Sequence, residues 1–217
     1  MTALLGVMVA TVSALLPLTN PPGAVATFAV LTAGQGPARV RSQAWRTALD
    51  VAAVLVVSAL VGTLLLNALG VSLPSLQIAG GIVVGHAGFR MLVPATPISP
   101  PEQQHAAMKT DIAFSPMALP LIAGPGSIGV VIALAARHPG VQARIGIVLG
   151  ILVIALLVGL CLRWATPVVD RLGPTGTGAL TRVMGFLILV IGVELVVHGV
   201  QALGVGGAAL SGSAGLG

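Results

Sequence analysis

The chain has 217 residues, of which 56% are hydrophobic and only 7% are charged, whereas a soluble domain is about 25% charged. With a mean hydropathy of +1.08, the composition excludes an ordinary soluble fold. The net charge of +5 does not indicate nucleic-acid binding, because the basic residues are scattered between apolar runs and aromatic residues make up only 3% of the chain. We therefore expect the lipid bilayer, and no nucleic acid, as a partner.

Six predominantly apolar runs follow one another along the chain, each long enough to cross a hydrocarbon core of about 30 Å. We expect transmembrane helices at residues 3–31, 48–69, 76–93, 112–136, 145–162 and 183–200. The first run has no basic region before Leu4 and continues past any cleavage site, so we interpret it as a retained span and not as a signal peptide. The predicted fold class is an all-α polytopic membrane protein with six transmembrane helices.

Basic residues are distributed unevenly between the two ends of these runs. Eight of the ten flank the first, third and fifth connections, and only Arg137 and Arg144 lie in the fourth. Lysine and arginine accumulate on the cytoplasmic side of a membrane, so the sequence predicts that both termini lie outside. The eight residues on the predicted cytoplasmic side are Arg39, Arg41, Arg46, Arg90, Lys109, Arg163, Arg171 and Arg182.

Two pairs of similar segments indicate an internal repeat. Residues 18–31 (LTNPPGAVATFAVL) resemble residues 121–134 (LIAGPGSIGVVIAL), 103 positions later, and residues 77–84 resemble residues 182–189, 105 positions later. A nearly constant offset favours a duplicated unit, and a unit of three spans is inverted in its second copy, as in many secondary transporters. We divide the chain into a first three-helix repeat (1–93), a cytoplasmic linker (94–109), a second three-helix repeat (110–203) and a flexible C-terminal tail (204–217).

Prolines and glycines interrupt the first helix of each repeat at matching places. Each proline lacks an N–H and clashes with the carbonyl four residues earlier, so Pro21 and Pro22 free two carbonyls in the first span, and Pro120 and Pro125 free two in the fourth. Unpaired backbone groups are costly in lipid, and matched breaks in inverted halves favour a binding site at the membrane midplane. Re-entrant hairpins and kinked helices both fit the pattern. The candidate substrate-binding residues are Asn20, Pro21, Pro22, Gly23, Ala123, Gly124, Pro125, Gly126 and Ser127.

Four segments carry a family resemblance. The two breaks read NPPGAVATFAVLTAG and PMALPLIAGPGSI, and the third and sixth predicted spans contain LGVSLPSLQIAGGIVV and RVMGFLILVIGVELVVHGV. These segments resemble those of the MarC family of integral membrane proteins, within the LysE-type transporter superfamily. The resemblance implies six spans in the inner membrane of prokaryotes, and transport of small neutral amino acids by at least one relative. The chain departs from the family's pattern at Gln77, His86, Arg90 and Glu194.

Two ionisable residues lie near the middle of predicted spans. Glu194 is in the sixth span and His86 in the third, and charged groups within a membrane are usually functional or paired. We take Glu194 and His86 as candidate coupling residues, and His198 shares a helix face with Glu194 because it follows four positions later. The lone Cys161 and the lack of a Cys/His cluster predict neither a metal site nor a cofactor.

The predicted function is a secondary transporter of a small solute, first among them a small neutral amino acid, with H+ or Na+ as the candidate coupling ion. The sequence has no GxxxxGK[ST] motif, so ATP does not drive transport through this chain directly. We expect no enzymatic activity, although Ser127 and His198 superficially resemble the pair of an intramembrane serine protease; Ser127 is not in a GxSG turn. A channel or a structural membrane subunit is the other alternative, and a homo-oligomer is compatible with the sequence.

Overall fold

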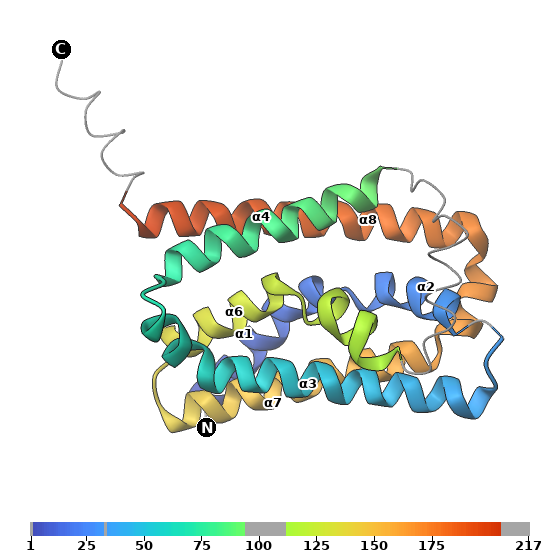
Figure 1. The fold of residues 1–217 in the computed structure, drawn as a ribbon, viewed down its shortest axis with the longest axis horizontal. Helices are drawn as coiled ribbons and strands as arrows, with labels where there is room; N and C mark the ends of the chain where they lie inside the picture. The colour runs from blue at the N-terminus through green and yellow to red at the C-terminus, as the bar shows by residue number, and fades with distance from the viewer. Residues whose placement is uncertain (1, 33, 94–111, 205–217) are drawn as a thin grey trace, which may run out of the picture.

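The computed structural model describes residues 2–32, 34–93 and 112–204, and most of its helices run along the longest axis of the molecule (Figure 1). The predicted linker 94–109 and the predicted tail beyond residue 204 lie outside the described residues. In chain order the helices are α1 (Thr2–Thr19), α2 (Pro21–Leu31), α3 (Pro37–Ala68), α4 (Leu73–Leu92), the π-helical segment η1 (Ala113–Ile122), α6 (Pro125–Arg137), α7 (Val141–Arg163) and α8 (Ala165–Ala202).

Several of these helices can cross a membrane by length and apolar composition. The bent pair Leu4–Thr19 and Gly23–Leu31 qualifies if it forms one span. Within the described residues, the protein is thus an all-α polytopic membrane protein with three candidate spans, or four with the bent pair. The three unbent candidates are Pro37–Ala68, Val141–Arg163 and Gly178–Ala202.

The candidate spans are fewer than the six that the sequence predicts. α4 is not among them, because Gln77, His86 and Arg90 lower the hydropathy of a 20-residue helix. The predicted span 112–136 is divided into η1 and the shorter apolar helix α6. α4 therefore differs from an ordinary span by its polar side chains, and residues 112–136 differ by a break in the backbone.

Two helices begin well before the spans that the sequence predicts. α3 begins at Pro37 and not at residue 48, because the basic residues of the predicted first connection continue the helix; arginine is a good helix former. α8 begins at Ala165 and not at residue 183, so the predicted fifth connection is largely helical. It is interrupted at Gly173, whose backbone (φ 63°, ψ 179°) is not helical, and glycine adopts positive φ readily.

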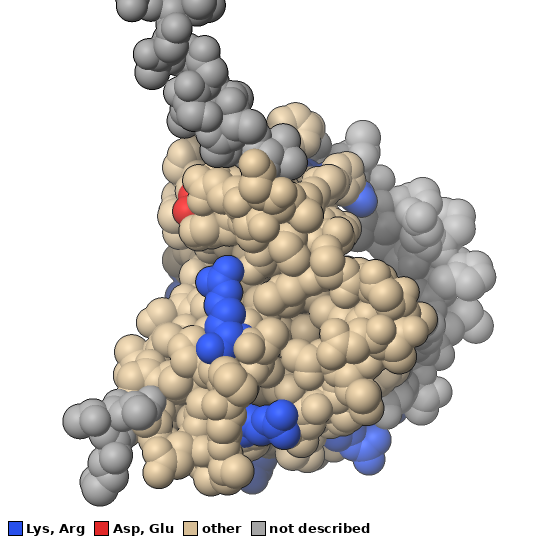
Figure 2. Space-filling view, turned by 90° about the vertical axis from the view of Figure 1, so that its left-hand side faces the viewer, with Lys and Arg blue, Asp and Glu red and all other residues tan. Residues whose placement is uncertain are grey.

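Large apolar side chains cover the outer surface of the helices. Leu64 is 69% exposed and Val30 is 66% exposed. Figure 2 shows one end of the molecule, where a few separate basic side chains and one acidic patch interrupt an uncharged surface. An apolar surface of this extent would promote aggregation in water, whereas in a bilayer it contacts the acyl chains.

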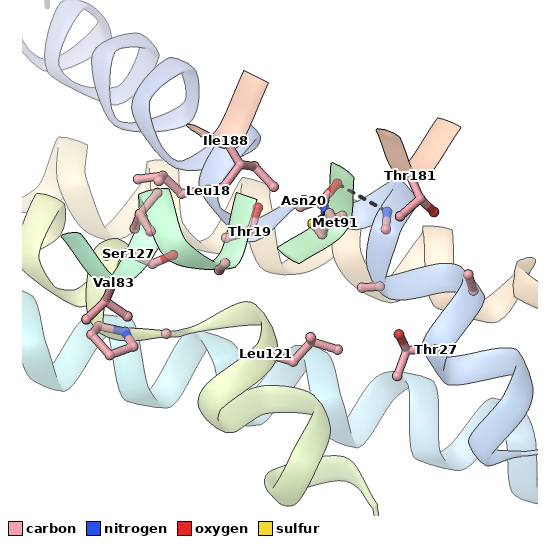
Figure 3. Close-up of a pocket in the computed structure, with 18 of the residues that line it drawn as sticks. Leu18, Thr19, Asn20, Thr27, Val83, Met91, Leu121, Ser127, Thr181 and Ile188 are labelled. Carbon is pink, nitrogen blue, oxygen red and sulfur yellow. Dashed lines mark hydrogen bonds between the residues drawn. The ribbon is translucent and has the colours of Figure 1, made fainter. Parts of the chain in front are cut away.

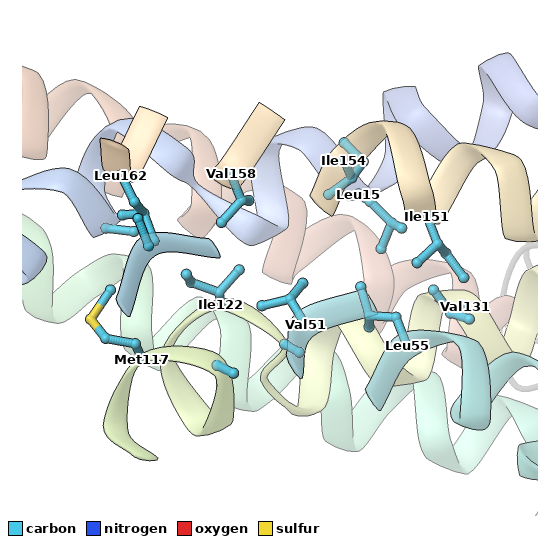
Figure 4. Close-up of a cluster of buried hydrophobic side chains, with 14 of the residues drawn as sticks. Leu15, Val51, Leu55, Met117, Ile122, Val131, Ile151, Ile154, Val158 and Leu162 are labelled. Carbon is cyan, nitrogen blue, oxygen red and sulfur yellow. The ribbon is translucent and has the colours of Figure 1, made fainter. Parts of the chain in front are cut away.

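The buried core lies where α1, α3 and α7 meet the η1–α6 segment (Figure 4). Because lipid is as apolar as leucine, the interior of such a bundle is stabilised by close packing and not by exclusion of water. The fully buried side chains include Leu15, Val51, Leu55, Met117, Ile122, Val131, Ile151, Ile154, Val158 and Leu162.

Glycines bring the backbones of α4 and α8 into direct contact. A Cβ atom added at Gly81 would lie 2.6 Å from the carbonyl oxygen of Gly192, and one added at Gly192 would lie 2.6 Å from Cα of Gly85. Small residues at a helix interface permit such an approach in membranes. Gly80 faces the other way, with its added Cβ 3.7 Å from the carbonyl oxygen of Pro125. α4 is therefore held between α8 and the start of α6.

This packing predicts that Gly192→Ala destabilises the protein, because the new methyl group would overlap the backbone of α4. We expect a loss of about 2 kcal/mol, the usual size of an overpacking effect. Gly6→Ala is the matched control: nothing lies within 4 Å of its added Cβ, and alanine is the better helix former. Thermal unfolding in detergent, followed by circular dichroism, measures both. Equal melting temperatures for the two variants would contradict the α4–α8 contact.

Candidate functional site

The first predicted break lies at Asn20. α1 ends at Thr19 and α2 begins at Pro21, and the two helices are bent by 52°. Asn20 adopts the left-handed conformation (φ 41°, ψ 60°), which asparagine tolerates better than most residues. Pro21 begins α2 without loss, because the first N–H groups of a helix have no intrahelical partner.

The side chain of Asn20 also caps α2. Its Oδ1 accepts a hydrogen bond of 3.1 Å from the backbone N–H of Gly23. A Cβ at Gly23 would lie 2.8 Å from Cγ of Asn20, so the cap requires glycine at this position. The Nδ2 of Asn20 is 3.8 Å from the sulfur of Met91 on α4, which is a weak interaction that leaves the amide able to donate to a ligand.

The second predicted break begins inside η1, where Leu119 before Pro120 is not helical (φ −120°, ψ 129°), and continues to the junction between η1 and α6. The backbone leaves helical geometry at Ala123 (φ −92°, ψ 56°) and Gly124 (φ −74°, ψ 177°), and α6 begins at Pro125. The hydroxyl of the buried Ser127 donates to the carbonyl of Ile122 across the break, at 3.2 Å. Unlike α2, α6 has no side-chain cap. Its first amide groups thus carry the partial positive charge of a helix N-terminus without a side chain to neutralise it.

Both breaks line one cavity of about 490 Å³, which we call the first cavity (Figure 3). Ligand-binding cavities commonly have volumes of about 300–1,000 Å³. Six of the nine predicted site residues line it: Asn20, Gly23, Gly124, Pro125, Gly126 and Ser127. Pro21 and Ala123 are buried beside it, and the side chain of Pro22 is not described. Segments about a hundred residues apart in sequence therefore meet at one site.

Two further helices complete the first cavity. α4 contributes Val83, Ala87 and Met91, which are spaced by four residues and share one face. α8 contributes Thr181 and Ile188. The spacing on α4 was visible in the sequence, but nothing in it indicated what this face contacts.

The first cavity is mostly apolar, with a few uncharged polar side chains. No ionisable side chain is among the described residues that line it, and its polar side chains are Thr19, Asn20, Thr27, Ser127 and Thr181. The hydroxyl of Thr19 is engaged, since it donates to the carbonyl of Leu15 at 3.0 Å. The cavity can therefore hold a small solute through backbone dipoles and a few hydroxyl and amide groups.

The predicted coupling residues lie elsewhere. Glu194 is 3.5 Å from Nε2 of His198, as the four-residue spacing suggested. Glu194 is not enclosed by the bundle: its side chain is 63% exposed and borders a second cavity. His86 is also exposed, on α4, and lines neither the first cavity nor the second cavity described below.

The described part of the chain contains neither a metal-binding cluster nor the Ser127–His198 pair of the protease alternative at one site. No group of three or more His, Cys, Asp or Glu residues is placed to hold a metal ion there. Cys161 is a free, half-buried cysteine. Ser127 lines the first cavity whereas His198 does not, so the two residues of the protease alternative do not share a site.

The geometry of the first break predicts that Asn20→Ala is more harmful than Asn20→Gly. Both changes remove the cap, but only alanine is also strained in the left-handed conformation, which costs about 1–2 kcal/mol, whereas glycine at a cap position costs a few tenths. Unfolding midpoints of the purified variants measure the difference. Equal stability of the alanine variant and the parent would show that the left-handed cap does not form.

Sequence comparison places the chain among known proteins. Residues 5–203 match the family described as MarC family integral membrane protein. The chain is 35% identical to the inner membrane protein MarC of Salmonella paratyphi A over 199 residues, covering 86% of this chain and 90% of that protein. With the same coverage, it is 34% identical to the Citrobacter koseri protein of that name and 33% identical to the Escherichia coli protein. No solved structure matches the chain. The resemblance of the signature segments is thus confirmed, and the chain belongs to the MarC family of integral membrane proteins.

Proposed function

We propose that this protein is a secondary transporter, and not an enzyme, that moves a small solute across the inner membrane through the first cavity. A small neutral amino acid is the first candidate. One observation carries the proposal: the two Pro-Gly breaks, from distant parts of the chain, line the same cavity. Broken helices with solute sites between them are typical of secondary transporters, and the relatives' name places them in the inner membrane.

The helix contacts support the inverted repeat that the proposal needs. If α1–α2, α3 and α4 correspond to η1–α6, α7 and α8, a twofold relation requires matched pairs of contacts. α2 packs on α8 and α4 packs on α6; α1 packs on α7 and α3 packs on η1; α2 packs on α7 and α3 packs on α6. This exchange of partners is what two inverted copies of one unit produce. We infer six spans, with the bent pair α1–α2 and the broken pair η1–α6 as the first and fourth.

The electrostatics of the first cavity favour a zwitterion. The uncapped start of α6, at Gly126 and Ser127, offers positive dipole ends and free amides to a carboxylate. The end of α1, at Leu18 and Thr19, offers carbonyl oxygens to an ammonium group. A zwitterion can thus be bound without a charged side chain, which agrees with the uncharged lining.

Leu18 provides the barrier that a transporter needs. It lines the first cavity and also a second cavity between α1, α4, α6 and α8, so a single side chain stands at the boundary of both. The basic side chains favour an orientation with both termini outside, in which the second cavity lies toward the outer side. The predicted coupling residues Glu194 and His86 do not line the first cavity.

Solute counterflow in proteoliposomes tests this function. Vesicles loaded with unlabelled alanine are expected to accumulate labelled alanine by exchange, since a transporter alternates between the two sides. A channel would equilibrate alanine without stimulation from the opposite side. If no amino acid or other small solute exchanges at all, the proposal fails.

A matched pair of substitutions in α6 places the exchange at the first cavity. A Cβ at Gly126 would overlap the side chain of Val84 inside the cavity, whereas a Cβ at Gly129 has an ordinary contact of 3.7 Å with Leu76. We expect Gly126→Ala to raise the half-saturating alanine concentration about tenfold, which corresponds to a loss of about 1.4 kcal/mol of binding free energy. Gly129→Ala should exchange like the parent. Equal effects of the two changes would show that the solute does not pass beside Gly126.

A further inference from the structure

The second cavity, of about 300 Å³, has a different chemical character from the first. Its ionisable and amide side chains come from three helices, whereas the first cavity has no ionisable lining residue among the described residues. Arg137 is in the last turn of α6, Gln77 is in the first turns of α4, and Glu194 and His198 are on α8. The remaining lining residues are Ser13, Ala14, Pro17, Leu18, Val130, Ala133, Leu134, Ile191 and Leu195.

Opposite charges face this cavity from different helices without neutralising one another. Arg137 makes no ion pair with any residue that the structure describes, and Glu194 is paired there only with the neighbouring His198. The guanidinium has five N–H donors in a fork that matches a carboxylate or a phosphate. The carboxylate of Glu194 is an acceptor for an ammonium group. A ligand that carries both a negative and a positive group could form an ion pair with each of these two side chains.

Gln77 gives an independent indication of a ligand. Its side chain is only 6% exposed and lines the second cavity, and no hydrogen bond to it is found within the described ranges. The amide is not fully enclosed by protein atoms, and it can both donate and accept a hydrogen bond at the cavity. Gln77 lies on α4, and the cavity that it lines is also lined by Arg137 of α6 and Glu194 of α8. It is therefore placed to bind the polar end of a ligand that spans Arg137 and Glu194.

The second cavity is also adjacent to the first. Leu18 lines both, and α6 reaches from one to the other: its start, at Gly126, lines the first cavity, and its end, at Arg137, lines the second. A ligand in the second cavity is thus separated from the first cavity by the end of α1 and the face of α6.

We propose that the second cavity is a separate binding site for a small zwitterion, in which Arg137 binds the anionic group, Glu194 binds the ammonium group, and Gln77 binds a polar atom between them. The zwitterion is either a free solute or the headgroup of a zwitterionic lipid. As a free-solute site, it would load the first cavity past Leu18; this role rests on the proposed transport function, whereas binding itself does not.

Protection of single cysteines from modification tests the site with glycine, the smallest zwitterionic amino acid, as the probe. In a Cys161→Ala background, Ser13→Cys reports on the second cavity and Thr27→Cys reports on the first; both positions are exposed to their cavities. The variants are placed in nanodiscs of anionic phosphatidylglycerol alone, and the rate of reaction with a charged methanethiosulfonate is measured. We expect saturating glycine to slow the reaction of Ser13→Cys about fivefold, and equal concentrations of acetate or methylammonium to have no such effect.

Charge variants link this protection to the proposed ligands. Glu194→Gln and Arg137→Gln are expected to remove the protection of Ser13→Cys while leaving that of Thr27→Cys in place. Arg144→Gln, an exposed arginine of α7 outside both cavities, is the matched control and should retain protection at both reporters. Because all three side chains are exposed, we expect the fold to tolerate these substitutions.

The outcomes separate this proposal from the transport function. Protection of Thr27→Cys but not Ser13→Cys by glycine, in any lipid, overturns the second site and leaves the first intact. Protection of Ser13→Cys that needs no glycine and appears only when phosphatidylethanolamine is added supports the site with a lipid headgroup as its occupant. Protection of Ser13→Cys that survives Glu194→Gln and Arg137→Gln overturns the assignment of Glu194 and Arg137 as the side chains that bind the zwitterion. Loss of protection at Thr27→Cys alone counts against the proposed function and not against the second site.

Discussion

The fold is governed by the need to satisfy every backbone polar group within a bilayer. Two helices are interrupted, and each interruption is resolved differently. At the first, Asn20 supplies its own side chain to the N–H of Gly23. At the second, Ser127 satisfies the carbonyl of Ile122, but α6 has no side-chain cap. The two breaks therefore have matching positions but unequal polarity, because only the start of α6 leaves its first amides without a side-chain cap.

Close backbone contact determines where these groups meet. On one side, glycines of α4 lie against the backbone of α8; on the other, Gly80 lies beside Pro125 at the start of α6. α4 consequently acts as a wall shared by the second break and α8. In lipid, where apolar side chains gain little by burial, such small-residue contacts define the interface more sharply than large side chains do. The site thus depends on glycines that a larger residue would displace.

The sequence predicted those features that depend on local chemistry. A proline removes an N–H wherever it stands, so the breaks at Asn20 and at Gly124 could be located, and six of nine proposed site residues line the first cavity. Features that depend on tertiary packing were not predictable. The sequence marks Glu194 as polar but does not show which helices surround it, and its side chain is 63% exposed beside the second cavity. Likewise, hydropathy marks where the apolar run of α3 begins but not where its helix begins, and the helix includes the basic residues before that run.

The central claim is that the two breaks enclose one solute between them. An experimental structure determined in lipid with saturating alanine tests it most directly. We expect interrupted helices at Asn20 and at Gly124, with the carboxylate of the solute against the amides of Gly126 and Ser127. Two continuous helices that face the bilayer, or a first cavity that stays empty at saturating solute, would contradict it.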